Sequence, residues 1–204
     1  MPTEIFPSVK ICCLYAIMHD MRNPFLIGEK VYLRPLERDD APTLLPWVND
    51  PDVIATLTIY TPKNLQSELE FIERASKSDT DIVLGIALKG SDMLIGTTGL
   101  HRIDWKNRHC MFGILIGDKT EWGKGYGTET TRLMCTYAFG ILGMHRIWLH
   151  VYEYNQRAIR AYEKAGFVCE GILREDRYHN GRFFDTIVMG LLRSEWEAHQ
   201  HQAL

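Results

Sequence analysis

The 204-residue sequence lacks the features that mark a membrane protein or a protein that binds polyanions. Its closest approach to a targeting or membrane segment, residues 11–18, holds eight apolar residues, too few to cross a bilayer. Positive charge is in no excess, because 23 Lys and Arg stand against 26 Asp and Glu for a formal net charge of −3. We therefore expect neither a membrane nor a nucleic acid as partner.

Cysteine pairs and metal-ligand spacings are missing too. The five cysteines never form C-x-x-C, are odd in number, and include an adjacent pair, Cys12 and Cys13, that could bridge only under strain. The eight histidines contain no H-x-x-x-H and no Cys/His cluster. These absences predict reduced cysteines, a cytoplasmic location and no metal.

Repeats and low-complexity tracts are also absent, which excludes a solenoid. Hydrophobic residues make up 46% of the chain, enough for the core of one compact domain. We expect that domain over residues 27–194, after an N-terminal extension at residues 1–26 and before a polar C-terminal tail at residues 195–204.

Hydrophobic periodicity and turn residues predict an α/β domain of the α+β type. Helices are expected in the N-terminal third, the first broken by Pro46 and the third capped by Asn64. Asn180 and Gly181 form the strongest hairpin signal. The other expected elements are strands at residues 31–34, 82–88, 94–100, 110–116, 147–151, 167–173 and 184–192, and helices at residues 128–142 and 155–164, ended by Gly143 and Gly166.

Residues 122–128 (WGKGYGT) carry the clearest chemical signal. Glycines at alternate positions let backbone N–H groups converge, and the helix expected next adds the positive end of its dipole, so this loop should hold a phosphate or pyrophosphate. A Walker A loop would need Ser or Thr after Lys124, where Gly125 stands, and a Rossmann fingerprint would need glycine where Thr128 stands. A plain glycine turn is the alternative on this motif alone.

A second motif follows at residues 155–167 (NQRAIRAYEKAGF), directly after the strand expected at residues 146–151. Together the two motifs closely resemble the GNAT acyl-CoA N-acetyltransferase superfamily, in particular its branch of ribosomal-protein-alanine N-acetyltransferases. The resemblance spans residues 27–193 and includes residues 32–36, 47–51 and 180–182. It implies a mixed, mostly antiparallel twisted sheet with a splayed central parallel pair, flanked by helices.

The resemblance implies acetyl-CoA as co-substrate and direct attack of an amine on the thioester. Tyr162 would protonate the leaving thiolate and Asn155 would bind pantetheine or water. Seven residues apart, they share one helix face, although Tyr162 could simply pack against Phe167 and Asn155 could simply cap its helix. The implied cofactor contacts are Ile114, Leu115, Ile116, Trp122, Gly123, Lys124, Gly125, Tyr126, Gly127, Thr128, Asn155, Tyr162 and Lys164.

One residue departs from the family pattern. Met111 stands where relatives usually carry a glutamate that acts as base through water. Methionine accepts no proton, so either the enzyme captures amine that is already neutral, or another side chain is the base. The candidates are His101, Asp104, His109, His150 and Glu153. Cys110 and Cys135 stand in no Cys/His arrangement and are interpreted as buried hydrophobes, not nucleophiles.

The acceptor side of such a fold is built by the N-terminal helices. There residues 37–52 hold five acidic residues against Arg38, a net charge of −4, which favours a cationic amine unless these carboxylates serve as caps and turns. We rank a protein N-terminal α-amine first by family branch, followed by a polyamine, an aminoglycoside or an amino acid. A non-catalytic acyl-CoA-binding module is the alternative of another class. A homodimer is a family-level expectation.

Overall fold

The computed structural model describes residues 21–202, with side chains up to residue 200, so residues 11–18, Cys12 and Cys13 lie outside the described residues. Eight strands form one sheet in the order β1-β2-β3-β4-β5-β6-β8-β7. The strands are β1 (Leu26–Ile27), β2 (Val31–Pro35), β3 (Ile82–Leu88), β4 (Leu94–Asp104), β5 (His109–Ile116), β6 (Arg146–Tyr152), β7 (Val168–His179) and β8 (Arg182–Leu192).

The centre of the sheet is a fork between β5 and β6. These two strands are parallel, and their pairing covers only His109 with Arg146, Cys110 with Ile147, and Met111 with Trp148. Every other pairing in the described sheet is antiparallel. Beyond Met111, β5 stays paired with β4 but has no partner on its β6 side. The predicted mixed sheet with a splayed parallel pair is therefore confirmed.

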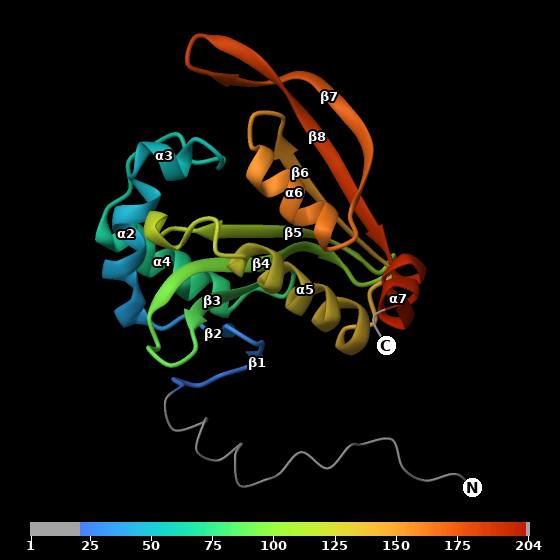
Figure 1. Cartoon of the computed structure of the whole chain (residues 1–204). Coiled ribbons are helices and arrows are strands. Elements are labelled where there is room, and N and C mark those ends of the chain that lie inside the picture. The colour runs from blue at the N-terminus through green and yellow to red at the C-terminus, as the bar shows by residue number, and fades with distance from the viewer. Residues whose placement is uncertain (1–20, 203–204) are drawn as a thin grey trace, which may run out of the picture.

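Helices flank the sheet on two sides (Figure 1). In that view α5 and α6 lie in front of the strands, the helices that precede β3 gather at the left, and the β7–β8 hairpin extends above the rest. A large apolar core joins the inner sides of β2 to β6 to α5, the π-helical turn and α6. The helices are α2 (Ala41–Val48), α3 (Pro51–Ile54), α4 (Leu65–Ser76), α5 (Tyr126–Thr136), α6 (Gln156–Lys164) and α7 (Arg193–Gln202), with single 3₁₀ turns at Arg38–Asp40 and Lys119–Glu121 and a π-helical turn at Tyr137–Ile141 after α5.

Local signals place several of these elements where they were expected. The Asn64 side chain accepts a hydrogen bond from the Ser67 amide and caps α4. Asn180 and Gly181 both have positive φ, 48° and 84°, as a two-residue hairpin turn of the favoured hand requires. The hairpin itself is longer than predicted, because β7 continues past residue 173 through a bulge between Leu173 and Arg177.

Two expectations differ from the structure. Pro46 lies inside α2 and does not break it: only the hydrogen bond to the Pro42 carbonyl is lost, and Leu44 and Val48 are buried against the neighbouring core. Residues 193–202, expected to be mostly polar tail, form α7. Its Trp196 ring stacks 5.4 Å from the Phe139 ring, so one aromatic contact with the core fixes an otherwise polar helix.

Candidate active site

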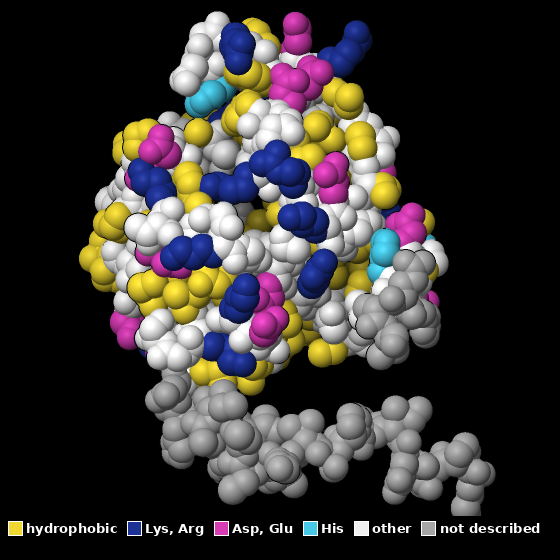
Figure 2. Space-filling model, in the orientation of Figure 1, with side chains coloured by type: hydrophobic (Ala, Val, Ile, Leu, Met, Phe, Trp, Pro, Cys, Tyr) yellow, Lys and Arg dark blue, Asp and Glu magenta, His cyan; other side chains and the backbone are white. Residues whose placement is uncertain are grey.

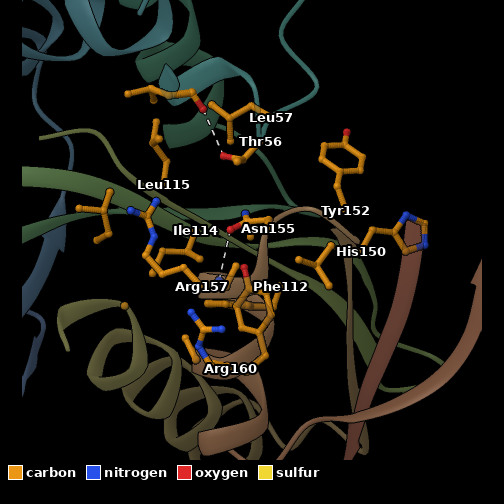
Figure 3. A pocket seen from close by; sticks show the side chains of 18 of the residues that line it. Thr56, Leu57, Phe112, Ile114, Leu115, His150, Tyr152, Asn155, Arg157 and Arg160 are labelled. Carbon is orange, nitrogen blue, oxygen red and sulfur yellow. Dashed lines mark hydrogen bonds between the residues drawn. The ribbon is translucent and has the colours of Figure 1, made fainter. Parts of the chain in front are cut away.

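A cavity of about 870 Å³ lies at the fork between β5 and β6. Its walls come from residues far apart in the chain: β5, the glycine loop (residues 122–128), the start of α6, β6, β7, and the segment that contains α3. In Figure 3, Asn155 lies near the middle, with Arg157 and Arg160 on one side and Tyr152 and His150 on the other. Thr56 and Leu57 lie above it in the same view.

The glycine loop presents unbonded backbone amides. Gly123 and Gly125 have φ of +79° and +92°, which L side chains rarely adopt, and Gly125 is the residue that precedes α5. Within residues 21–202, no oxygen accepts a hydrogen bond from the amides of residues 123–128. Six N–H groups at and before the N-terminus of an eleven-residue helix thus have no acceptor among the described residues, an arrangement that favours an anion.

Trp122 holds this loop against its neighbours. Its indole Nε1 donates a 2.7 Å hydrogen bond to the Ile116 carbonyl at the end of β5. The Arg157 guanidinium lies 3.8 Å from the Trp122 ring centroid, and burial lowers the pKa of Arg157. The tryptophan therefore links the glycine loop, β5 and α6, and the Ile116 carbonyl is not free as expected for a pantetheine partner.

Cationic side chains line the same end of the cavity. Arg157, Arg160 and Lys164 follow one another along α6 at intervals of three and four, which places them on one helix face. Figure 2 shows Lys and Arg side chains gathered on the face where α5 and α6 lie. Lys124 is different: its Nζ lies 2.9 Å from the buried Glu121 carboxylate, and it does not line the cavity, whereas the other predicted cofactor residues do.

Tyr162 and Asn155 both line the cavity, as their shared helix face predicted. Tyr162 is buried, its ring meets Phe112 edge-on at 6.1 Å and Phe167 at the same distance, and burial raises the pKa of its hydroxyl. The Asn155 side-chain oxygen accepts from the Ala158 amide at 3.2 Å and caps α6. Packing and capping are thus real for both residues, but they leave the Tyr162 hydroxyl and the Asn155 Nδ2 group for a ligand.

Of the five candidate bases, His150 is the one that lines the cavity. Partial burial lowers the pKa of His150, against the opposing effect of Asp176, and Arg102 lowers it further. The other candidates are engaged elsewhere: His101 pairs with Asp81 at 3.1 Å, His109 with Asp104 at 3.6 Å, and Glu153 accepts from the Asp185 amide at 3.1 Å. The two described cysteines considered as nucleophiles do not line the cavity. Burial raises the pKa of Cys110 to about 12 and also raises the pKa of Cys135, so both thiols stay protonated.

The segment that contains α3 closes the cavity on the side opposite α6. Sequence reasoning missed this contact, because no local motif marks it. Arg177 on β7 donates to the Tyr60 hydroxyl at 2.7 Å and to the Ala55 carbonyl at 3.3 Å, and its guanidinium lies 4.5 Å from the Tyr152 ring centroid. Tyr154 also donates to the Ala55 carbonyl, at 2.6 Å. We call the cavity-lining residues Val53, Thr56, Leu57, Thr58 and Tyr60 the α3 wall.

The acidic residues of the stretch 37–52 do not reach the cavity. Asp40 is buried and accepts two 2.8 Å hydrogen bonds from Arg34. Asp39 pairs with Arg22 at 2.7 Å, while Asp50 and Asp52 both lie 2.8 Å from the Lys119 ammonium. Four of the five acids in this stretch therefore already have a cation, as the alternative of caps and ion pairs expected, and Glu37 forms no ion pair within residues 21–202. In this arrangement the acidic stretch does not contribute charge to the cavity.

Between residues 21 and 202, no three His, Cys, Asp or Glu side chains come together in a group that could hold a metal ion. No helix in this part of the chain is long and apolar enough to cross a membrane.

Free amides at a helix N-terminus, a cationic helix face and a forked parallel strand pair define the class of acyl-CoA-dependent transferases. Comparison with known proteins specifies the class: residues 30–168 match the acetyltransferase (GNAT) domain, and the chain belongs to this family. It is an acetyl-CoA-dependent N-acetyltransferase, as the sequence motifs predicted.

Several relatives match nearly their whole length. The spermidine N(1)-acetyltransferase of Vibrio cholerae is 31% identical over 83% of this chain and 97% of its own. A Bacillus subtilis protein provisionally named a ribosomal N-acetyltransferase, YdaF, is also 31% identical, over 84% of this chain and 96% of its own. The crystal structure of the Vibrio cholerae spermidine N-acetyltransferase in complex with CoA and spermine superposes with a TM-score of 0.77 at 28% identity, covering 82% of this chain and 98% of that one.

Proposed function

We propose that this protein transfers the acetyl group of acetyl-CoA to the primary amine of a small molecule. The observation that carries the proposal is the cavity itself, which joins six free loop amides and the cations of α6 at one end to a space under the α3 wall at the other. The hydrogen bonds of Arg177 and Tyr154 to the Ala55 carbonyl hold the α3 wall over the cavity, which favours a small acceptor. Relatives named spermidine N-acetyltransferases, whose names give a small amine as substrate, also favour a small molecule over a protein N-terminus as acceptor.

The proposed chemistry is direct acyl transfer. The amine nitrogen bonds to the thioester carbonyl carbon, and backbone amides of β5 at the fork stabilise the oxyanion. The C–S bond then breaks, the Tyr162 hydroxyl gives its proton to the thiolate, and water restores that proton. The raised pKa of Tyr162 keeps the hydroxyl protonated at neutral pH, as an acid requires. His150, neutral because its pKa is lowered, accepts the proton that the amine loses.

The cofactor contacts follow from the same geometry. Residues 123–128 would bind the pyrophosphate through their amides, and the main chain at Ile114 and Leu115 would pair with the pantetheine arm. Arg160 and Lys164 are then placed for the remaining phosphate of CoA. The Lys124 side chain, paired with Glu121, takes no part beyond its backbone amide.

The experiment that tests the function is release of free thiol from acetyl-CoA with a panel of small amines, amino acids, aminoglycosides and N-terminal peptides. We expect turnover with small amines and none, or far less, with peptides. A preference for peptides would restore the protein N-terminus as acceptor, and no thiol release with any amine would contradict the proposal.

A homodimer stays a prediction. The edge strand β7 and its partner β8 expose apolar side chains, among them Ile172, Tyr178 and Phe183, which favours self-association along this hairpin. Sedimentation equilibrium of the full chain tests it, with Phe183→Ser expected to shift the mass towards the monomer. The cytoplasmic location also stays a prediction.

A further inference from the structure

The cavity end under the α3 wall carries two arginines, Arg102 on β4 and Arg177 on β7. His150 and Tyr152, two residues apart on β6 and therefore on one face of the sheet, line the cavity together with both arginines, and the Arg177 guanidinium lies 4.5 Å from the Tyr152 ring centroid. Neither arginine forms an ion pair within residues 21–202. We call this end of the cavity, bounded by Tyr60, His150 and Tyr152, the far end.

Arg177 is a buried cation with neutral partners. Its exposure is 6%, and it donates to the Tyr60 hydroxyl, the Tyr154 hydroxyl and the Ala55 carbonyl. A guanidinium has five N–H groups, so these bonds leave two donors, and the faces of the Tyr60 and Tyr152 rings, 5.0 and 4.5 Å away, meet the positive charge in place of a carboxylate. A buried charge of this kind is costly unless an anion approaches it, and here the cavity is the side from which an anion can come.

Arg102 reaches the cavity through an irregular strand. It has φ of +49°, and the β4–β5 register shifts between His101 and Asp104, so a bulge interrupts the alternation of side chains at this point. A non-glycine residue in the left-handed region is uncommon, and such conformations gather at functional sites. The bulge thus adds a second cation to the far end.

The far end has more cationic than anionic side chains. Asp176 is the carboxylate that lines it, and Glu121, which also lines the cavity, is paired with Lys124 beside the glycine loop. Two arginines against one aspartate leave an excess of one positive charge while His150 is neutral. A polycation would therefore meet repulsion here. Asp39, Asp40, Asp50 and Asp52 do not offset it, because each is already paired with an arginine or a lysine.

We propose that the acceptor is a small primary amine whose other end carries an anion, a carboxylate or a phosphate-like group, received by Arg102 and Arg177. This inference rests on the proposed function, since it names the substrate class of that same site. Guanidinium groups match both anions through paired N–H donors. Asp176 and His150 lie on the same end and would face the amine rather than the anion.

The test compares amines matched in length: γ-aminobutyrate, its amide, aminopropylphosphonate and putrescine, each with shorter and longer homologues. Thiol release from acetyl-CoA gives kcat/KM, and calorimetric titration of the CoA-bound protein gives acceptor affinity independently of turnover. We expect an anionic amine to exceed the neutral amide and the diamine about 10- to 100-fold in both measurements, the usual worth of charged hydrogen bonds. The carboxylate and phosphonate arms identify which anion is preferred.

Arg102 is the variant of choice, because its guanidinium has no partner in the described chain that the substitution would disturb. Arg102→Gln should remove most of the preference, and Arg102→Glu should reverse it towards putrescine. Arg174→Gln is the matched control, since Arg174 is exposed on β7 and does not line the cavity.

The outcomes separate the inference from the proposed function. If putrescine or the amide equals the anionic amines, or if no anionic amine binds, the inference is overturned while acetyl transfer to the other amines stands. If anionic amines bind the CoA complex but no amine releases thiol, the anion site is supported and the proposed function fails.

Discussion

The two ends of the cavity are built in different ways. The glycine loop offers backbone amides from one stretch of seven residues, reinforced by side chains of the adjacent helix α6. The far end is built from side chains of β4, β6, β7 and the α3 wall, which together span more than a hundred residues of the sequence. Backbone N–H groups remain hydrogen-bond donors for an anion whatever side chains the loop carries. A site made of side chains can change its ligand through single substitutions. The first end therefore fits a constant cofactor and the second a particular acceptor.

Tyr162 lines the cavity as the proposed acid, and its substitution should have the largest effect. Tyr162→Phe keeps the ring contacts with Phe112 and Phe167 but removes the acid, so kcat should fall about 10²- to 10⁴-fold while acetyl-CoA affinity stays the same. Steady-state kinetics and calorimetry measure the two quantities. Turnover at the parent rate would mean that water protonates the thiolate.

His150 should give the far end its pH dependence. Because its pKa is lowered by burial, kcat/KM referred to the neutral form of the acceptor should rise with pH through a limb below about pH 6.5 and then level, at the same position for every acceptor. His150→Gln should lower this kcat/KM about 10²-fold at neutral pH and remove the limb. The exposed His145, changed to Gln, is the control. A parent profile that already lacks the limb would show that no protein base acts.

Gly125 tests the glycine loop alone. Gly125→Asp adds strain at a φ of +92° and a negative charge among the amides, and should weaken acetyl-CoA binding about 10- to 100-fold by calorimetry. Two controls isolate the charge: Gly125→Asn in the loop, and Gly90→Asp, at a similar φ of +87° with no atom near the new side chain. Equal affinity in Gly125→Asp and the parent would exclude the loop from the cofactor site.

Arg157 should show the smallest effect. Removing its stacking on Trp122 in Arg157→Ala should raise the Kd for acetyl-CoA about fivefold, the order expected of one cation–π contact, without changing acceptor preference. Arg74→Ala, on exposed α4, controls for net charge. A change in acceptor preference would show that the two ends are coupled through α6.

The features that could be predicted from the sequence are those whose geometry depends on a few consecutive residues. The glycine loop, the caps at Asn64 and Asn155 and the turn at Asn180 and Gly181 each need only a few consecutive positions, because the backbone itself determines their geometry. The fork followed from the family resemblance to those same local motifs.

What the sequence could not predict depends on contacts between distant segments. Arg177 and Tyr60 are 117 residues apart, and neither carries a local pattern that announces the other. The acids at residues 50 and 52 are a second case: their partner Lys119 lies about seventy residues further along the chain, and it offsets a charge that the local count leaves in place. The β7 extension beyond residue 173 is visible only where β8 pairs with it.

The buried ion pair of Arg34 and Asp40 makes the free energy of unfolding depend on pH in the acid range. Burial acts to raise the pKa of Asp40, but hydrogen bonds from Arg34 and from the Glu37 amide outweigh it and hold the pKa below its usual range. The unfolded chain then binds that proton more tightly than the folded one. The stabilisation is complete above the ordinary carboxyl pKa of about 3.9 and is lost as pH falls through the lower folded value. Urea unfolding across this range should show a larger loss in the parent than in Asp40→Asn, because Asp39, Asp50 and Asp81 also have lowered pKa values and are still present in the variant. At neutral pH the free energy of unfolding of Asp40→Asn should be lower than that of the parent by about 3 kcal/mol. A constant difference at every pH would refute the linkage. An ion pair that no substrate touches thus contributes to how acidic a solution this enzyme can withstand.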